Sequence, residues 1–269
     1  MKLFKFKNDT RCYSIHDRKE GMICFEEFEN DVKWEKGIPY AKNVKEIEYV
    51  SNVCHVLLSS SHIDEKWAYY NLKDRISKYD RVCVLAFSFY DDTKNLDDWN
   101  RQYKPGQGIF YHENTDIFFK YGIKLDQICW VNYFMDSKEE MISKIKNSSI
   151  LLLTGGAPDL MMKRIKEKGL KRIIKEYKGM VIGYSAGAMI QFDSYHITPD
   201  EDYHLFSYQT GLGYISGFDI EVHYCDSKKQ RESIQKVKEE KQLNVYGIGE
   251  DGGIIVDECI HLFGYICTY

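Results

Sequence analysis

The chain has 269 residues, enough for one large domain or two small ones. Its 37 Lys and Arg residues against 41 Asp and Glu residues give a formal net charge of -4, which offers no positive field to a phosphate backbone, so nucleic-acid binding is not expected. No apolar run approaches the roughly 20 residues of a membrane helix, and the first ten residues lack the apolar segment of a secretion signal. The sequence therefore predicts a cytoplasmic protein with no membrane partner.

The first part of the chain, residues 1–52, differs from the rest. It carries short stretches of alternating polarity at residues 4–7 and 22–25, followed by an acidic patch at residues 26–31. Two or three such strands are unstable unless they dock on something larger. We therefore expect residues 1–52 to form a small antiparallel β appendage packed on the main domain.

From residue 53 to residue 269, short apolar runs alternate with helical patterns. The expected strands are residues 53–59, 81–89, 127–134, 149–154 and 180–184, and the expected helices are residues 64–79, 93–103, 114–121, 138–146 and 158–177. This alternation is typical of βαβ units. The sequence predicts one α/β domain over residues 53–269, with a mostly parallel sheet flanked by helices.

The eight cysteines include no Cys-x-x-Cys pair, and several lie inside apolar runs. This usage is typical of reduced core thiols in a reducing compartment. We expect no disulfide, no metal ion and no cofactor.

The expected strand at residues 180–184 runs directly into Gly183-Tyr184-Ser185-Ala186-Gly187. The pattern G-x-S-x-G is typical of a nucleophile on a sharp strand-to-helix turn, where side chains at the glycine positions would collide with neighbouring backbone. We predict that Ser185 is a nucleophile at the carboxyl end of the sheet. The alternative is an ordinary turn with Ser185 as the helix cap.

A second glycine signal, Gly155-Gly156, follows the expected strand at residues 149–154. Such a turn leaves backbone N–H groups pointing out of the carboxyl edge of a sheet. We predict an oxyanion hole formed by the N–H groups of Gly156 and Ala186. The alternative is a tight turn that needs glycine for its backbone conformation alone.

A serine nucleophile needs a base, and His223 is the best-placed histidine because it ends an alternating, strand-like stretch at residues 218–224. His55 lies at the start of its strand, at the opposite edge of the sheet. The remaining histidines have loop or surface contexts: His62, His112, His196, His204 and His261.

The third member of the site is an acid after His223. Glu250 lies between glycines in a β-rich run, from which its carboxylate can accept the Nδ1–H of His223 and stabilise the imidazolium. Asp251 precedes Gly252 and is expected to form a turn. Asp226 is expected to cap the helix that begins after it. Both remain competitors of Glu250.

The order of the Gly-Gly turn, G-Y-S-A-G-A, a strand-end histidine and Gly247-Ile248-Gly249-Glu250 resembles the peptidase E and cyanophycinase family. Its members are serine hydrolases with a fold like that of class I glutamine amidotransferases. The resemblance covers residues 53–269. It implies the roles given above for Ser185, His223, Glu250, Gly156 and Ala186, and an acyl-serine intermediate.

Peptidase E removes N-terminal aspartate from dipeptides, so the resemblance implies a small peptide substrate with an acidic first residue. Lys228, Lys229 and Arg231 are candidates for meeting such a group. The family's usual Gly-Gly-Asn is Gly-Gly-Ala here, ending at Ala157, and this departure bears on aspartyl specificity more than on hydrolysis. The long loops at residues 91–113 and 194–210 are expected to admit only a short chain end, and the protein is expected to be a monomer or homodimer.

Two other classes compete with a peptidase. An α/β-hydrolase esterase would place its acid before its histidine, whereas the order here is Ser185, His223, Glu250. A glutamine amidotransferase would need Cys at position 185. A non-catalytic binding module with the glutamine amidotransferase fold remains a further alternative.

Overall fold

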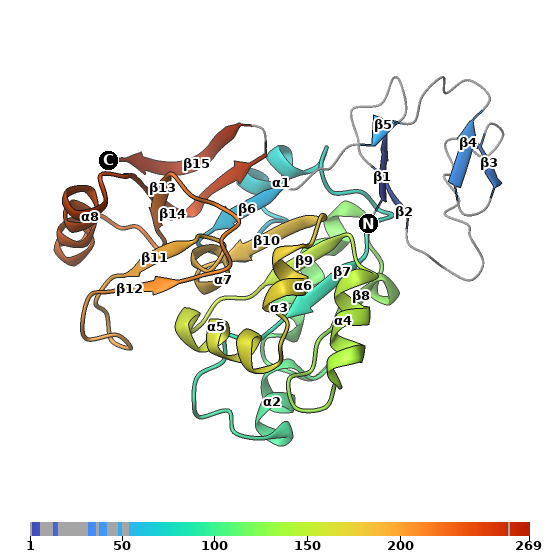
Figure 1. Ribbon diagram of the computed structural model, residues 1–269, viewed down its shortest axis with the longest axis horizontal. Helices are drawn as coiled ribbons and strands as arrows, with labels where there is room; N and C mark the ends of the chain where they lie inside the picture. Colours follow the sequence, from blue (N-terminus) through green and yellow to red (C-terminus); the bar gives the residue numbers. More distant parts are fainter. Residues whose placement is uncertain are drawn as a thin grey trace.

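The computed structural model describes residues 54–257 and 259–269, together with five short strands nearer the N-terminus (Figure 1). These strands are β1 (Lys2–Lys5), β2 (Tyr13–Ile15), β3 (Val32–Glu35), β4 (Ile38–Ala41) and β5 (Glu48–Tyr49). β1 pairs with β2 and β5, and β3 pairs with β4, all antiparallel. The expected packing of residues 1–52 on the main domain lies outside the described residues and stays a prediction.

The core of the molecule is an eight-stranded sheet with the order β13-β14-β6-β10-β9-β7-β8, in which β15 also pairs with β14. Its strands are β6 (His55–Leu58), β7 (Val82–Leu85), β8 (Ile128–Trp130), β9 (Ile150–Leu153), β10 (Met180–Tyr184), β13 (Phe218–Glu221), β14 (Asn244–Val256) and β15 (Ile260–Thr268). All neighbouring pairs are parallel except β14 with β6 and β14 with β15. The predicted mostly parallel α/β sheet is confirmed.

Helices cover both faces of this sheet (Figure 1). One face carries α1 (Lys66–Leu72), α2 (Leu96–Tyr103), α3 (Tyr111–Thr115) and the 3-10 turn η1 (Asp116–Tyr121). The other carries α4 (Lys138–Lys146), α5 (Pro158–Glu167), α6 (Lys171–Lys175) and the short α7 (Ala186–Met189). A second 3-10 turn, η2 (Leu125–Gln127), precedes β8, and α8 (Lys228–Lys241) packs beside β13 and β14. No helix among the described residues is long and apolar enough to cross a membrane.

The central strands are buried throughout because both faces of the sheet are covered. In β6, for example, Leu57 packs in one core, while Val56 and Leu58 pack in the other. Buried strands read as continuous apolar runs rather than as alternating ones. This explains why the runs were recognisable in the sequence as strands of a parallel sheet.

Several expected elements differ from the structure. The helix expected over residues 64–79 ends at Leu72 as α1, and the one expected over residues 114–121 is mostly the 3-10 turn η1. The helix expected over residues 158–177 is two helices, because Gly169 adopts a left-handed conformation with φ of 66° between α5 and α6. The segment at residues 194–210, expected as a loop, forms an antiparallel hairpin of β11 (Ser194–Ile197) and β12 (Ser207–Thr210). The segment at residues 91–113, expected as a loop around a helix at residues 93–103, contains that helix as α2 and also the start of α3.

The six cysteines among the described residues are all free thiols: Cys54, Cys83, Cys129, Cys225, Cys259 and Cys267. Cys54 and Cys83 are buried as expected, and burial raises the pKa of Cys54 to about 11. Cys225 and Cys259 are exposed, so the expectation of core thiols is wrong for these two.

Candidate active site

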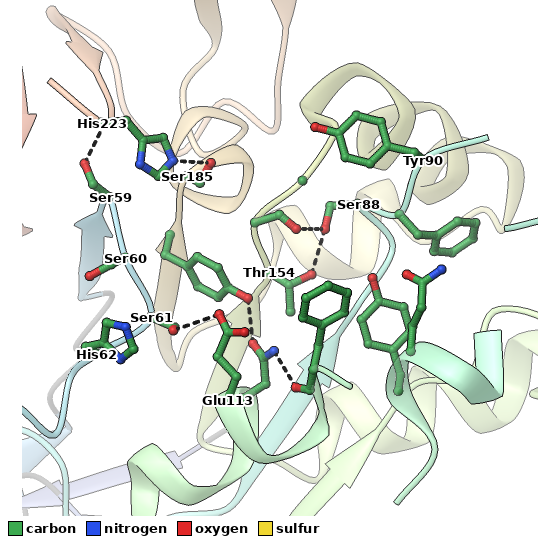
Figure 2. A pocket seen from close by; sticks show the side chains of 18 of the residues that line it. Ser59, Ser60, Ser61, His62, Ser88, Tyr90, Glu113, Thr154, Ser185 and His223 are labelled. Atoms are coloured by element: carbon green, nitrogen blue, oxygen red, sulfur yellow. Dashed lines mark hydrogen bonds between the residues drawn. The ribbon is translucent and has the colours of Figure 1, made fainter. Parts of the chain in front are cut away.

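Four strands of the sheet deliver polar groups to its carboxyl edge. Ser59 follows β6, the Gly155-Gly156 turn follows β9, Ser185 follows β10, and His223 lies two residues beyond β13. Open α/β sheets bind ligands at this edge. Figure 2 shows Ser59, Ser185 and His223 side by side at the rim of a cavity.

Ser185 occupies a strained turn between β10 and α7, with φ of 51° and ψ of -118°. A Cβ atom at Gly183 would collide with the carbonyl oxygen of Gly187, and one at Gly187 would collide with the carbonyl oxygen of Leu153. Both glycines of G-x-S-x-G are therefore required by the close approach of backbone. This strain is typical of a functional position rather than of an ordinary helix cap.

Ser185, His223 and Glu250 form one hydrogen-bonded chain. Ser185 Oγ lies 2.9 Å from His223 Nε2, and His223 Nδ1 lies 2.6 Å from Glu250 Oε1. The side chains of His223 and Glu250 are 47% and 66% exposed. One imidazole nitrogen thus faces a hydroxyl and the other faces a carboxylate, which is the arrangement needed to move a proton to and from the serine.

A β-bulge aims Glu250 at His223. The register of β14 against β15 shifts between Ile248 and Gly252, so Glu250 and Asp251 lie in the irregular part of the strand. Bulges bend a strand and redirect its side chains, and they are frequent next to active sites. The turn expected at Asp251 is wrong, because Asp251 lies within β14.

The other competing acid, Asp226, is occupied elsewhere. Its carboxylate lies 2.9 Å from Arg231, and the hydrogen bond from this guanidinium lowers the pKa of Asp226. Its expected role as a helix cap is wrong, since Ser227 caps α8 by accepting a hydrogen bond from the backbone N–H of Gln230. Among the described residues, Asp226 makes no hydrogen bond with His223.

Two residues that the sequence analysis missed hold the backbone of His223, whose φ is 53°. Ser59 Oγ accepts a hydrogen bond of 2.9 Å from the His223 N–H and donates one of 2.7 Å to the carbonyl of Ile248. Gln230 Nε2 donates a hydrogen bond of 2.9 Å to the His223 carbonyl. A run of three serines at the end of β6 was the only sequence signal for Ser59.

The Gly155-Gly156 turn is fixed by Ser88, which follows β7. The N–H of Ala157 donates a 2.7 Å hydrogen bond to the Ser88 carbonyl, and Ser88 Oγ lies 2.8 Å from Thr154 Oγ1 (Figure 2). Gly156 has a φ of 132°, and a Cβ atom there would collide with the Ser88 carbonyl oxygen. Among the described residues, the N–H groups of Gly156 and Ala186 have no acceptor, so both are available to a ligand.

Two cavities meet at Ser185, and both are lined by Gly156, Ser185 and His223. The first has a volume of about 400 Å³ and is walled by residues of α2 and α3. The second has a volume of about 380 Å³ and is walled by β13 and the β11–β12 hairpin. Ser185 thus lies at the boundary of both cavities.

His196, expected in a loop or surface context, is instead a buried residue of β11. It is 1% exposed, and its Nδ1 and Nε2 lie 2.9 Å from Asp219 and 2.8 Å from Glu221. Burial opposes protonation, but the hydrogen bonds and charges of both carboxylates outweigh it and raise the pKa of His196 to about 10. Among the described residues, no group of three or more His, Cys, Asp and Glu side chains is arranged to hold a metal ion.

Comparison with known proteins agrees with this fold. The model of peptidase family S51 matches residues 107–260, more than half of the chain. The fold is similar to the crystal structure of a protein named as a putative peptidase E from Listeria monocytogenes EGD-e, with a TM-score of 0.55, 15% identity, and coverage of 81% of this chain and 98% of that chain. It is also similar to a peptidase from an acI-B1 Actinobacterium, with a TM-score of 0.54, 12% identity, and coverage of 81% and 94%. No curated protein matches the chain.

The fold and the family match together define a serine peptidase built on an α/β sheet. The chain belongs to peptidase family S51. The resemblance to the peptidase E family is thereby confirmed, and membership of family S51 supports a serine peptidase.

Proposed function

We propose that the enzyme hydrolyses small peptides through an acyl-Ser185 intermediate, with His223 as the base and Glu250 as the orienting acid. The single observation that carries this proposal is the continuous chain from Ser185 Oγ through His223 to Glu250, with links of 2.9 and 2.6 Å. Both links are within the reach that proton transfer between a nucleophile, its base and an orienting acid requires.

In the first half of the reaction, Ser185 Oγ attacks the scissile carbonyl carbon while His223 Nε2 takes the proton of the Ser185 hydroxyl. Glu250 accepts the Nδ1–H of the resulting imidazolium and stabilises its charge. The negative oxygen of the tetrahedral intermediate is held by the N–H groups of Gly156 and Ala186. The imidazolium then protonates the leaving amine, and the C–N bond breaks.

In the second half, water attacks the acyl ester of Ser185, and His223 takes a proton from that water. Collapse of the second tetrahedral intermediate breaks the bond to Ser185 Oγ, which recovers its proton from His223. The products are an amine and a carboxylic acid, and the enzyme is regenerated.

The shape of the site supports a small substrate. Ser185 lies where the two cavities meet, between the α2–α3 segment on one side and the β11–β12 hairpin on the other. A folded protein cannot bring an internal peptide bond into such a recess without local unfolding. A short peptide needs no such unfolding, which favours a small substrate.

In the part of the chain that the structure describes, the acidic first residue implied by the family resemblance finds no free cationic partner in the second cavity, because the His196 imidazolium that lines it is already paired with Asp219 and Glu221. No Lys or Arg lines either cavity among the described residues. Of the three basic candidates, Arg231 pairs with Asp226 and Lys228 pairs with Glu232 on the surface of α8. We therefore leave acidic specificity out of the proposal. Monomeric or dimeric assembly and a cytoplasmic location stay predictions.

The test is the intact mass of the chain after treatment with a fluorophosphonate probe, for the native protein and for Ser185→Ala. We expect a single adduct on the native protein and none on the variant, followed by Ser185-dependent cleavage of dipeptides and tripeptides. A folded native chain that takes no adduct would contradict the proposed acyl-serine chemistry. Cleavage of unfolded casein at internal sites, with short peptides untouched, would contradict the substrate size.

A further inference from the structure

The first cavity, which opens onto Ser185, has an aromatic lining. Five aromatic side chains contribute to it: Phe89, Tyr90, Tyr103, Phe110 and Tyr184. Three of them are buried in the sheet-facing core, whereas Tyr90 and Phe110 are 41% and 40% exposed. The cavity is thus aromatic both in its depth and at its mouth.

Of the two exposed rings, Tyr90 is held by a hydrogen bond of 2.8 Å from its hydroxyl to Asp202, whereas Phe110 has no polar group to bond. Phe110 precedes α3, and its neighbour Ile109 is 74% exposed. Single exposed apolar side chains are common on protein surfaces, but Tyr90 and Phe110 also line the cavity and so give a ligand an apolar surface to contact. Phe110 also lies 5.9 Å from Tyr103, ring centre to ring centre, so the mouth continues the aromatic wall inward.

The polar side chains deeper in the cavity are largely bonded to one another. Tyr184 donates a hydrogen bond of 2.8 Å to Asn114, whose amide donates one of 2.9 Å to the carbonyl of Phe110. Ser61 donates to Glu113 over 3.2 Å (Figure 2). These hydrogen bonds hold the walls in place, and the aromatic side chains form part of the surface that a ligand meets.

The charges of the cavity disfavour an acidic occupant. Its carboxylates are Glu113 and Glu250, its imidazoles are His62 and His223, and no Lys or Arg lines it among the described residues. An aspartate side chain would lose its hydration without gaining a cationic partner. An aromatic side chain gains ring contacts with the walls and loses little on leaving water.

We propose that the first cavity is a subsite for an aromatic side chain of the peptide, at one of the two residues that flank the scissile bond. This inference rests on the proposed function, because the occupant is placed by its bond to the carbonyl that Ser185 attacks. The volume of about 400 Å³ accommodates the largest side chains. Specificity for aromatic rather than acidic residues follows from the lining.

The test is a series of tripeptides in which each of the two flanking residues is Phe, Ala, Asp or Arg in turn, with cleavage measured as kcat/KM. We expect Phe to exceed Ala by about tenfold or more at one of these positions, as the burial of a phenyl ring would give. In Phe110→Ala the ratio of Phe to Ala peptides should fall severalfold. The matched control is Phe119→Ala, which removes a ring of similar exposure, 44%, that does not line the cavity.

Fluorophosphonate labelling of Ser185 separates the two possible failures. If the native protein is not labelled at Ser185, the proposed function itself is overturned. Normal labelling with equal cleavage of Phe and Ala peptides, or with fastest cleavage of Asp or Arg peptides, overturns only the aromatic subsite. A preference for Phe that is the same in Phe110→Ala as in the native protein also overturns it, whereas the native panel alone decides the matter if that variant fails to fold.

Discussion

Two histidines beside β13 each contact carboxylates, and they differ in what their second nitrogen meets. His223 has one nitrogen on Glu250 and the other on the hydroxyl of Ser185, and nearly half of its side chain is exposed. His196 has both nitrogens on carboxylates and is buried. A base must be able to lose its proton as well as gain it.

The environment therefore assigns different tasks to the same side chain. With two buried acids as partners, His196 is held as an imidazolium that bridges β11 to Asp219 and Glu221 of β13. Its proton is unavailable to a substrate. His223 has a single acid, contact with solvent and a hydroxyl within reach, so its proton can move. Position at the strand end, and not residue type, distinguishes the candidate catalytic histidine from the structural one.

The largest expected effect comes from neutralising Glu250, the acid that bonds His223. Glu250→Gln should lower kcat by about 10⁴-fold, as loss of the tautomer-fixing acid does in other triads, with little change in Tm because Glu250 is 66% exposed. The control is Asp226→Asn, which removes a carboxylate that bonds Arg231 instead. The assignment of Glu250 is wrong if Asp226→Asn abolishes activity while Glu250→Gln keeps it.

The exposed group of Ser185, His223 and Glu250 was predictable from the sequence, because local sequence patterns mark its members. A G-x-S-x-G motif and a histidine ending an alternating run both lie at strand ends, and the structure brings Ser185, His223 and Glu250 within hydrogen-bonding distance. The parallel sheet was predictable for a related reason, since its buried strands are continuous apolar runs. The bulge that aims Glu250 was not, because it depends on the pairing of β14 with β15.

The buried cluster of His196, Asp219 and Glu221 was not predictable, because it forms only through tertiary contacts. His196 lies 23 and 25 residues before its two acids, in a hairpin whose sequence looked like a loop. Ser59 lies 164 residues before His223, whose backbone N–H donates to its hydroxyl. The periodicity of apolar residues along the sequence does not indicate contacts between residues so far apart. The break at Gly169 was missed for the opposite reason, since the helical apolar pattern continues past it while the backbone does not.

The second effect concerns stability. His196→Gln leaves Asp219 and Glu221 buried without a cation, which should lower the free energy of unfolding near pH 7 by about 3–5 kcal/mol. The pKa of His196 is raised from 6.5 to about 10, so its stabilising contribution is complete below pH 6.5 and is lost as the pH rises through 10.

Urea denaturation of both proteins between pH 7 and pH 10 checks this prediction. The difference between the native protein and His196→Gln should be largest near pH 7 and should shrink toward pH 10. Equal stabilities at pH 7, or a difference that grows with pH, would show that His196 is not held as an imidazolium. Fluorophosphonate labelling of the folded fraction should persist in the variant, because His223 keeps its own partners.

The smallest expected effect concerns the backbone of His223. Ser59→Ala removes a buried hydroxyl that accepts from the His223 N–H and donates to the Ile248 carbonyl, and it leaves both groups without that partner. We expect a loss of about 1–3 kcal/mol in the free energy of unfolding. Because His223 is held in a left-handed conformation with φ of 53°, kcat should also fall, by roughly tenfold, while KM changes little.

The comparison variant is Ser60→Ala. The Ser60 hydroxyl donates to the carbonyl of Glu250 at an exposed position, where water can replace it. If both variants lose the same stability and the same kcat, then Ser59 does not position His223, and the strained backbone is held by Gln230 and the strand alone.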